Sequence, residues 1–337
     1  MGSWLRPAVG RAFESVPFDR ALSLLERADR GQRDLLAALT YHRVAYADAI
    51  RGYPGLVSAS PYQFEEQMDF LARRFRVVAL DDVLEARKTG RPLGRHAVML
   101  TFDDAYRDFG EYAWPALRLR RLPATLFVPT AYPGQADRAF WWDWLYEALT
   151  GASDGAVVQT PAGTLRLSSY HERLTAYRRI RAEVKRGHHD AGMALVADVA
   201  GEQLGTPPPP SPVLDWSDLR ALAAEGVALA PHSRTHPLLD RIEPVELARE
   251  LAGSLADLEQ RVGTTPPAFA YPSGSYSEAV RTAVSEAGFS VAFTTRRGLN
   301  RLGRTDWLTL RRINVGRASS LNALRAQLGS WALAWSR

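Results

Sequence analysis

The chain has 337 residues, of which 46% are hydrophobic and none is cysteine, so it can bury a sizeable core but cannot form disulfides, thiolate metal sites or a cysteine nucleophile. Its formal net charge of +5 comes from scattered arginines and not from one basic block, and no nucleic-acid recognition motif accompanies it. We therefore expect a globular protein with a basic surface and no nucleic-acid partner. Attraction to anionic lipid, polyphosphate or acidic sugar stays open.

The start of the chain predicts a helical extension over 1–37, because apolar residues recur at helical spacing over 8–37. It lacks the basic start and apolar core of a signal peptide, and no run of about 18 apolar residues could span a membrane. We therefore expect a cytoplasmic protein without a transmembrane segment.

Short apolar runs then alternate with amphipathic stretches, which is typical of a parallel sheet covered by helices. The runs cover residues 38–41, 77–80, 97–102, 124–128, 227–230, 268–271, 291–294 and 308–313. Seven or eight such strands predict an α/β fold in which residues 38–320 form a closed or nearly closed barrel.

One segment, over 139–214, breaks this alternation. It begins with an aromatic cluster at 140–146, continues with a charged, helical-looking stretch, and ends in four prolines at 207–210, which cannot lie in a helix or a central strand. We interpret it as a helical insertion between two strands, near the loop face of the barrel. Packing is the favoured role of its tryptophans, and Trp142 or Trp141 facing a sugar-binding groove is the alternative.

The C-terminal segment, 321–337, is amphipathic. It predicts a helix that packs on the barrel. Peripheral contact with a membrane surface is the alternative.

Two short motifs follow predicted buried strands. Thr101-Phe102-Asp103-Asp104 comes after one apolar run and His232-Ser233-Arg234-Thr235-His236 after another. Two imidazoles and one carboxylate make a common ligand set for a divalent metal, and an adjacent carboxylate can act as a base on water. Taken singly, the aspartates could be a helix cap and the histidines surface loop residues. Together, after two strands, they predict the metal site of a hydrolase.

These motifs in this order, followed by Tyr271-Pro272-Ser273-Gly274, resemble the polysaccharide deacetylase family, also called the NodB-homology or carbohydrate esterase 4 family. The resemblance covers roughly residues 38–315 except the insertion. It implies a distorted TIM-like barrel of strand–helix units. The implied reaction is hydrolytic removal of an N-acetyl, or sometimes an O-acetyl or formyl, group from a sugar.

The resemblance also implies roles for single residues. Asp103 matches the catalytic base, and Asp104, His232 and His236 match the metal ligands. This donor set favours zinc, although cobalt, nickel or iron also suit it. Substrate contacts are expected from a groove wall at Tyr271 and Pro272, and from Trp142 and Arg312.

The sequence departs from the family pattern at two places. Many members have an arginine that orients the catalytic aspartate where this chain has Ala270, and Arg311 or Arg312 could replace it. Many members also have a late histidine that protonates the leaving amine, whereas no histidine follows His236 here. His42, which follows the first predicted strand, could be the proton donor, a substrate contact or a structural histidine.

The sequence as a whole predicts a metal-dependent hydrolase that removes an N-acyl group from a sugar, in particular from a cytoplasmic precursor of a surface polysaccharide. Two alternatives remain open. One is a carbohydrate-binding barrel without activity, and the other is a deformylase or amide hydrolase acting on a non-sugar substrate.

Overall fold

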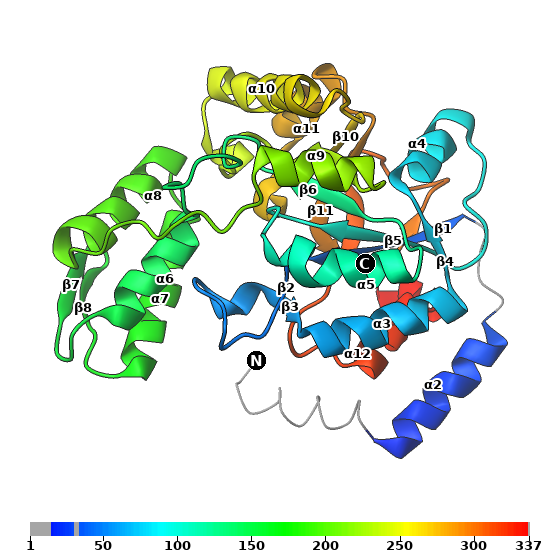
Figure 1. The fold of residues 1–337 in the computed structure, drawn as a ribbon, viewed down its shortest axis with the longest axis horizontal. Coiled ribbons are helices and arrows are strands. Elements are labelled where there is room, and N and C mark those ends of the chain that lie inside the picture. The colour runs from blue at the N-terminus through cyan, green and yellow to red at the C-terminus, as the bar shows by residue number, and fades with distance from the viewer. Residues whose placement is uncertain (1–14, 30–33, 336–337) are drawn as a thin grey trace.

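The computed structural model describes residues 15–29 and 34–335, and its centre is a sheet of parallel strands in the order β10-β11-β13-β1-β5-β6-β9 (Figure 1). Their bounds are β1 (Leu35–Tyr41), β5 (Ala97–Phe102), β6 (Thr125–Val128), β9 (Ala228–Pro231), β10 (Ala268–Ala270), β11 (Val291–Arg297) and β13 (Leu310–Asn314). The two end strands of this order, β9 and β10, lie side by side, so the sheet is a nearly closed barrel. The predicted barrel is confirmed.

Two short strands extend the sheet, and two small sheets accompany it. β4 (Arg76–Val78) pairs in parallel with the first half of β5, and β12 (Asn300–Arg301) pairs antiparallel with β1. Outside the barrel sheet, β2 (Arg43–Val44) pairs with β3 (Val57–Ala59).

The strands are continuous apolar runs because both faces of the sheet are covered. All seven residues of β1 and all six of β5 are buried. Inward-facing side chains from all seven barrel strands meet in one apolar cluster, which includes Leu36, Met99, Phe127, Ala230, Ala270, Phe293 and Leu310. The alternate residues of the same strands, such as Leu39 and Leu100, belong to a second cluster under the outer helices.

Helices follow most strands and cover the outside of the barrel. They are α3 (Pro61–Arg74), α4 (Leu80–Thr89), α5 (Trp114–Leu119), α9 (Trp216–Ala224), α10 (Pro244–Val262) and α11 (Glu278–Glu286). Local sequence sets their ends: Ser60 and Gln63 form a capping box at the start of α3, and α10 ends at the left-handed Gly263. Residues of α4 join the inner cluster together with Ala97, the first residue of β5. α4 therefore packs at the amino ends of the strands and leaves their carboxyl ends for a site.

The N-terminal region differs from the predicted helix over 8–37. Helix α2 spans Val16–Ala28, and residues 35–37 belong to strand β1, where Leu36 pairs with Ala97 of β5. They form a strand because they continue an apolar run that is buried on both faces. Residues 1–14 and 30–33 of the predicted extension lie outside the described residues.

The C-terminal segment folds as helix α12 (Leu321–Leu328) followed by a 3-10 helix at Ser330–Trp335. Arg325 of α12 donates hydrogen bonds to Glu26 of α2 at 2.8 and 2.9 Å. The two end helices therefore pack together on the barrel. Among the described residues, no helix is both long enough and apolar enough to cross a bilayer.

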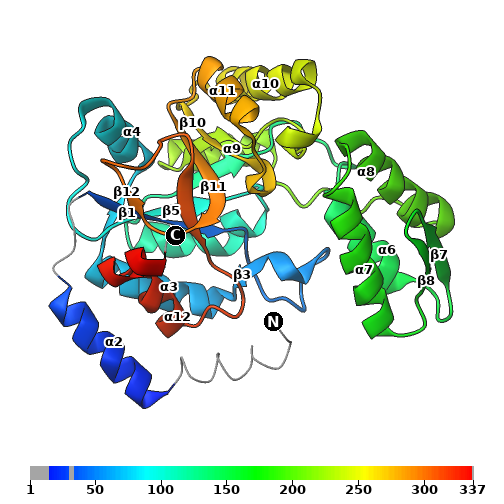
Figure 2. The ribbon, with the colours of Figure 1, turned by 180° about the vertical axis from the view of Figure 1, so that it is seen from behind.

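A lobe lies between β6 and β9, in the region predicted as an insertion. It contains α6 (Trp141–Gly151), α7 (Tyr170–Val184), α8 (His189–Val196) and a π-helix at Ala197–Gln203. A hairpin of β7 (Val157–Thr160) and β8 (Gly163–Arg166) joins them, which the sequence analysis did not predict. The lobe has its own apolar cluster, and it stands on the side of the barrel opposite α2 (Figures 1 and 2).

Candidate active site

The two neighbouring aspartates lie just beyond the carboxyl end of β5. The backbone N–H of Asp103 donates to the carbonyl of Tyr41 at 2.9 Å, which continues the pairing of β5 with β1. Asp104 then leaves the extended conformation, with a φ of 72°. Adjacent strand residues would point to opposite faces, so this left-handed turn lets both carboxylates face the same cavity.

The two histidines are brought together by a tight loop after β9. His232 continues the β6–β9 pairing through its N–H, and the loop that follows contains left-handed Ser233 and His236, with φ values of 60° and 59°. The Ser233 hydroxyl accepts a hydrogen bond from the His236 N–H at 3.0 Å. This strained loop brings the two imidazoles together, with their ring centroids 4.9 Å apart.

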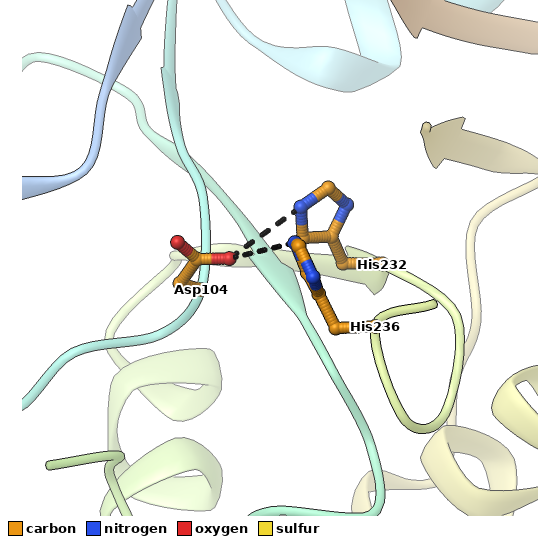
Figure 3. A group of neighbouring side chains, drawn as sticks. All are labelled: Asp104, His232 and His236. Atoms are coloured by element: carbon orange, nitrogen blue, oxygen red, sulfur yellow. Dashed lines mark ion pairs between the residues drawn. The ribbon is translucent and has the colours of Figure 1, made fainter. Parts of the chain in front are cut away.

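Asp104, His232 and His236 form a buried group of metal-ligand type (Figure 3). The Asp104 Oδ1 atom lies 3.3 Å from His236 Nε2 and 3.6 Å from His232 Nε2, and this oxygen has no hydrogen-bond partner among the described residues. The Nδ1 atom of His232 lies 2.7 Å from the carbonyl of Ala270. Since that carbonyl can only accept, Nδ1 carries the proton and Nε2 presents its lone pair to the group. These donors fit a divalent metal.

Burial explains the ionisation of this group. It raises the pKa of Asp104 well above its usual range, and the nearby charge of Asp103 adds to the effect. Burial also lowers the pKa values of His232 and His236, so both imidazoles are neutral at pH 7. Neutral imidazoles are the form that binds metal, and a bound cation would favour the ionised form of Asp104.

Asp103 is held by Arg312, which lies on β13. The guanidinium donates to both carboxylate oxygens, at 2.8 and 2.7 Å, and also to the carbonyl of Thr294 at 2.9 Å. Burial would raise the pKa of Asp103, but Arg312 more than offsets it and holds that pKa well below the usual range. Arg312 thus occupies the orienting role that we considered for it or Arg311. Its side chain is only 1% exposed, faces Asp103 and does not line the cavity described below, so its predicted contact with substrate is not supported by this position.

A cavity opens beside these residues. The barrel contributes His42, Asp103, Asp104, His232 and His236, and the lobe contributes Trp141, Trp142, Tyr177, Arg181 and Lys185. The cavity therefore lies between the carboxyl ends of the barrel strands and the inserted lobe.

His42 lines this cavity from the end of β1. Burial lowers the pKa of His42 to about 4, although the charge of Asp103 partly opposes the effect. The imidazole is therefore neutral at pH 7. A neutral imidazole at this position can accept a proton or a hydrogen bond from a group in the cavity.

Trp142 lines the cavity and packs against His236, one of the proposed metal ligands. Its ring lies 4.9 Å from that of His236 in an edge-to-face arrangement, and its indole N–H donates to the Tyr106 hydroxyl at 3.0 Å. Because these contacts hold the ring in place, Trp142 both supports the metal-ligand group and forms part of the cavity wall.

Tyr271 and Pro272 do not line the cavity, so their predicted contact with substrate is not supported. The side chain of Tyr271 is fully buried in an apolar cluster outside the barrel, and its hydroxyl donates to the carbonyl of Leu308 at 3.0 Å. Residues 268–271 alternate between the two faces of the sheet, which turns Ala270 inward and Tyr271 outward. Ser273 is the residue of this motif that reaches the cavity.

Sequence analysis missed two charged cavity residues, Arg181 and Lys185. They lie at the end of α7, in the stretch that the sequence marked only as charged and helical-looking. The signal was their spacing, because residues 177, 181 and 185 recur every four positions and so share one helix face with the buried Tyr177.

Comparison with known proteins agrees with this geometry. The family model of polysaccharide deacetylases matches residues 90–292. The poly-beta-1,6-N-acetyl-D-glucosamine N-deacetylase of Staphylococcus aureus (strain MSSA476) is 30% identical over 108 residues, which are 29% of this chain and only 37% of that relative.

Two solved structures share the fold. The Streptococcus pyogenes deacetylase PplD, in complex with acetate, has a TM-score of 0.57 and 18% identity, over 87% of this chain and 98% of that one. IcaB from Ammonifex degensii has a TM-score of 0.57 and 19% identity, over 88% and 97% of the two chains. The chain belongs to the polysaccharide deacetylase family.

Proposed function

We propose that this protein is a metal-dependent hydrolase that removes an N-acetyl or other N-acyl group from a sugar. The observation that carries the proposal is the pairing of two groups at one cavity. A buried Asp104–His232–His236 cluster fits a metal, and beside it lies an ionised carboxylate, Asp103, whose Oδ2 is 4.0 Å from His232 Nε2. This pairing suits hydrolysis of an amide.

The donor set favours zinc, with cobalt, nickel or iron as alternatives. A divalent ion at Asp104, His232 and His236 would supply Lewis acidity, which polarises an acyl carbonyl and makes water more acidic. The orphaned Oδ1 atom of Asp104 supports its presence, since an unpartnered buried carboxylate oxygen is costly without a cation.

Asp103 acts as the general base in this proposal. Arg312 keeps the carboxylate ionised and holds both of its oxygens in place, so Asp103 can accept a proton from the attacking water without changing conformation. The water oxygen first forms a C–O bond with the acyl carbon, the C–N bond then breaks, and the leaving amine takes up a proton. His42 is the candidate carrier of that proton, because it is neutral and can receive one before it donates it.

An acylated sugar that serves as a precursor of a surface polysaccharide is the proposed substrate. Two observations support an acylated sugar: the Staphylococcus aureus relative is named for a poly-N-acetylglucosamine substrate, and Trp141 lines the cavity with an aromatic ring of the kind that packs on sugars. The cytoplasmic location stays a prediction, which cell fractionation tests.

The test measures acetate and formate release from N-acetylated and N-formylated sugars and oligosaccharides. The protein is first loaded with zinc or cobalt, and Asp103→Asn is assayed beside the wild type. Release that depends on both metal and Asp103 supports the proposal. Binding of sugar with no release would favour a non-catalytic barrel, and release only from non-sugar amides would favour a different hydrolase.

A further inference from the structure

Two cations of the inserted lobe face the cavity without a counterion. Arg181 and Lys185 both line it, and within the described ranges neither forms an ion pair with a carboxylate. By contrast, the buried arginines Arg43 and Arg312 are each paired with an aspartate, at 2.7 Å. The lobe therefore presents positive charge that the protein itself does not neutralise.

Both cations are held in place by uncharged partners. The guanidinium of Arg181 lies over the ring of Tyr53, 5.4 Å from its centroid, and the ammonium of Lys185 donates to the Ser273 hydroxyl at 3.1 Å. Ser273 belongs to the barrel, so this bond joins the lobe to the barrel at the cavity. The two side chains are thus positioned, and their remaining N–H groups are available to a ligand.

The charge of the cavity points to an anionic ligand. Asp103 and Arg312 form an ion pair, so their charges cancel each other. A divalent ion at Asp104 would leave one excess positive charge, and Arg181 and Lys185 add two more. Burial, together with the repulsion from Arg181, lowers the pKa of Lys185 to about 8, while the charge of Asp104 opposes that shift. A neutral sugar would leave this positive charge uncompensated.

We propose that Arg181 and Lys185 form a subsite for an oxyanion, so that the substrate is an acylated amino sugar carrying a phosphate or carboxylate group. This inference deepens the proposed function and rests on it. Guanidinium and ammonium groups bind both oxyanions through charge-assisted hydrogen bonds, and these are strongest where solvent is partly excluded. The subsite lies on the lobe and the metal-ligand group on the barrel, so one sugar can contact both.

The experiment compares binding of three probes by isothermal titration calorimetry: methyl N-acetylglucosaminide, N-acetylglucosamine 1-phosphate and N-acetylglucosaminuronic acid. Each is titrated into metal-free and zinc-loaded protein. We expect one or both charged probes to bind at least about ten-fold more tightly than the neutral one, in metal-free protein as well. Comparing the phosphate with the carboxylate identifies the group that the subsite prefers.

The variants Lys185→Met and Arg181→Gln should each weaken binding of the preferred charged probe by about 10- to 100-fold, the loss expected for one charge-assisted hydrogen bond, and should weaken binding of the neutral probe much less. Arg178→Gln is the matched control, because it removes the same charge from an exposed position of α7 outside the cavity. Lys185→Arg keeps the charge and should retain most of the preference, which separates loss of the subsite from misfolding of the lobe.

Equal affinity for charged and neutral probes, or an equal effect of Arg178→Gln, would overturn the subsite. Binding needs no turnover, so this result is independent of the proposed chemistry. If metal-loaded protein releases no acyl group from any probe, the hydrolase proposal fails, whereas the charge preference can still be measured.

Discussion

Replacing Arg312 by methionine should destabilise the fold and, at the same time, impair Asp103, the proposed base. The arginine and Asp103 are both almost fully buried, with side chains 1% and 3% exposed, and two hydrogen bonds of 2.8 and 2.7 Å join them. Removing one partner leaves an unpaired carboxylate inside the barrel. Breaking a buried pair in this way costs about 3–5 kcal/mol.

The free energy of unfolding, measured by urea denaturation at pH 7, checks this value. Arg311→Met is the matched control: Arg311 is the preceding residue of β13, its side chain is partly exposed, and within the described part of the chain that side chain donates one hydrogen bond, to the carbonyl of Arg297 at 3.3 Å. We expect it to cost far less. The double variant Asp103→Asn/Arg312→Met removes both charges and should recover much of the lost stability.

The loss of stability caused by Arg312→Met should become smaller as pH falls. Arg312 holds the pKa of Asp103 below its unfolded value, so the stabilisation is fully present above the unfolded pKa of about 4 and is lost as pH falls below it. The stability gap between wild type and Arg312→Met should therefore narrow in acid. The variant Arg312→Lys keeps the positive charge but cannot donate to both oxygens of Asp103 in the way the guanidinium does. In this variant the fall of kcat/KM at acidic pH should set in at a higher pH than in the wild type. If Arg312→Lys kept full activity and its kcat/KM fell at the same acidic pH as that of the wild type, the reasoning would be refuted.

Four further predictions concern the cavity. Elemental mass spectrometry should find about one transition metal per wild-type chain and none in His236→Ala; no metal in either, even after reconstitution, would contradict the metal site. Asp103→Asn should keep the metal and lose about 10²- to 10⁴-fold in kcat, so retention of full turnover would rule it out as the base. His42→Asn should lower kcat at unchanged metal content, whereas an unchanged kcat would make His42 a structural residue. Affinity for N-acetylglucosamine 1-phosphate should fall as pH rises past about 8, where Lys185 loses its proton, and Lys185→Arg should remove this fall.

Local sequence predicted the barrel strands and the residues at their carboxyl ends. Continuous apolar runs mark strands buried on both faces, and Asp103, Asp104 and His232 follow directly from two of them. Parallel strands bring their carboxyl ends to one face of the barrel, so residues far apart in sequence could be placed together before the structure was known. The same reasoning indicated His42 after β1, and the structure places it at the cavity.

Tertiary structure alone decided which arginine binds Asp103 and which residues of the inserted lobe line the cavity. Sequence left Arg311 and Arg312 as equal candidates, and the pleat of β13 turns only Arg312 inward, to a carboxylate 209 residues earlier in the chain. Arg181 and Lys185 belong to a stretch that looks like any charged helix, because its sequence specifies the helix face but not what that face meets. Their role depends on how the lobe packs against the barrel. That packing arises from many weak contacts between distant segments, which local periodicity does not encode.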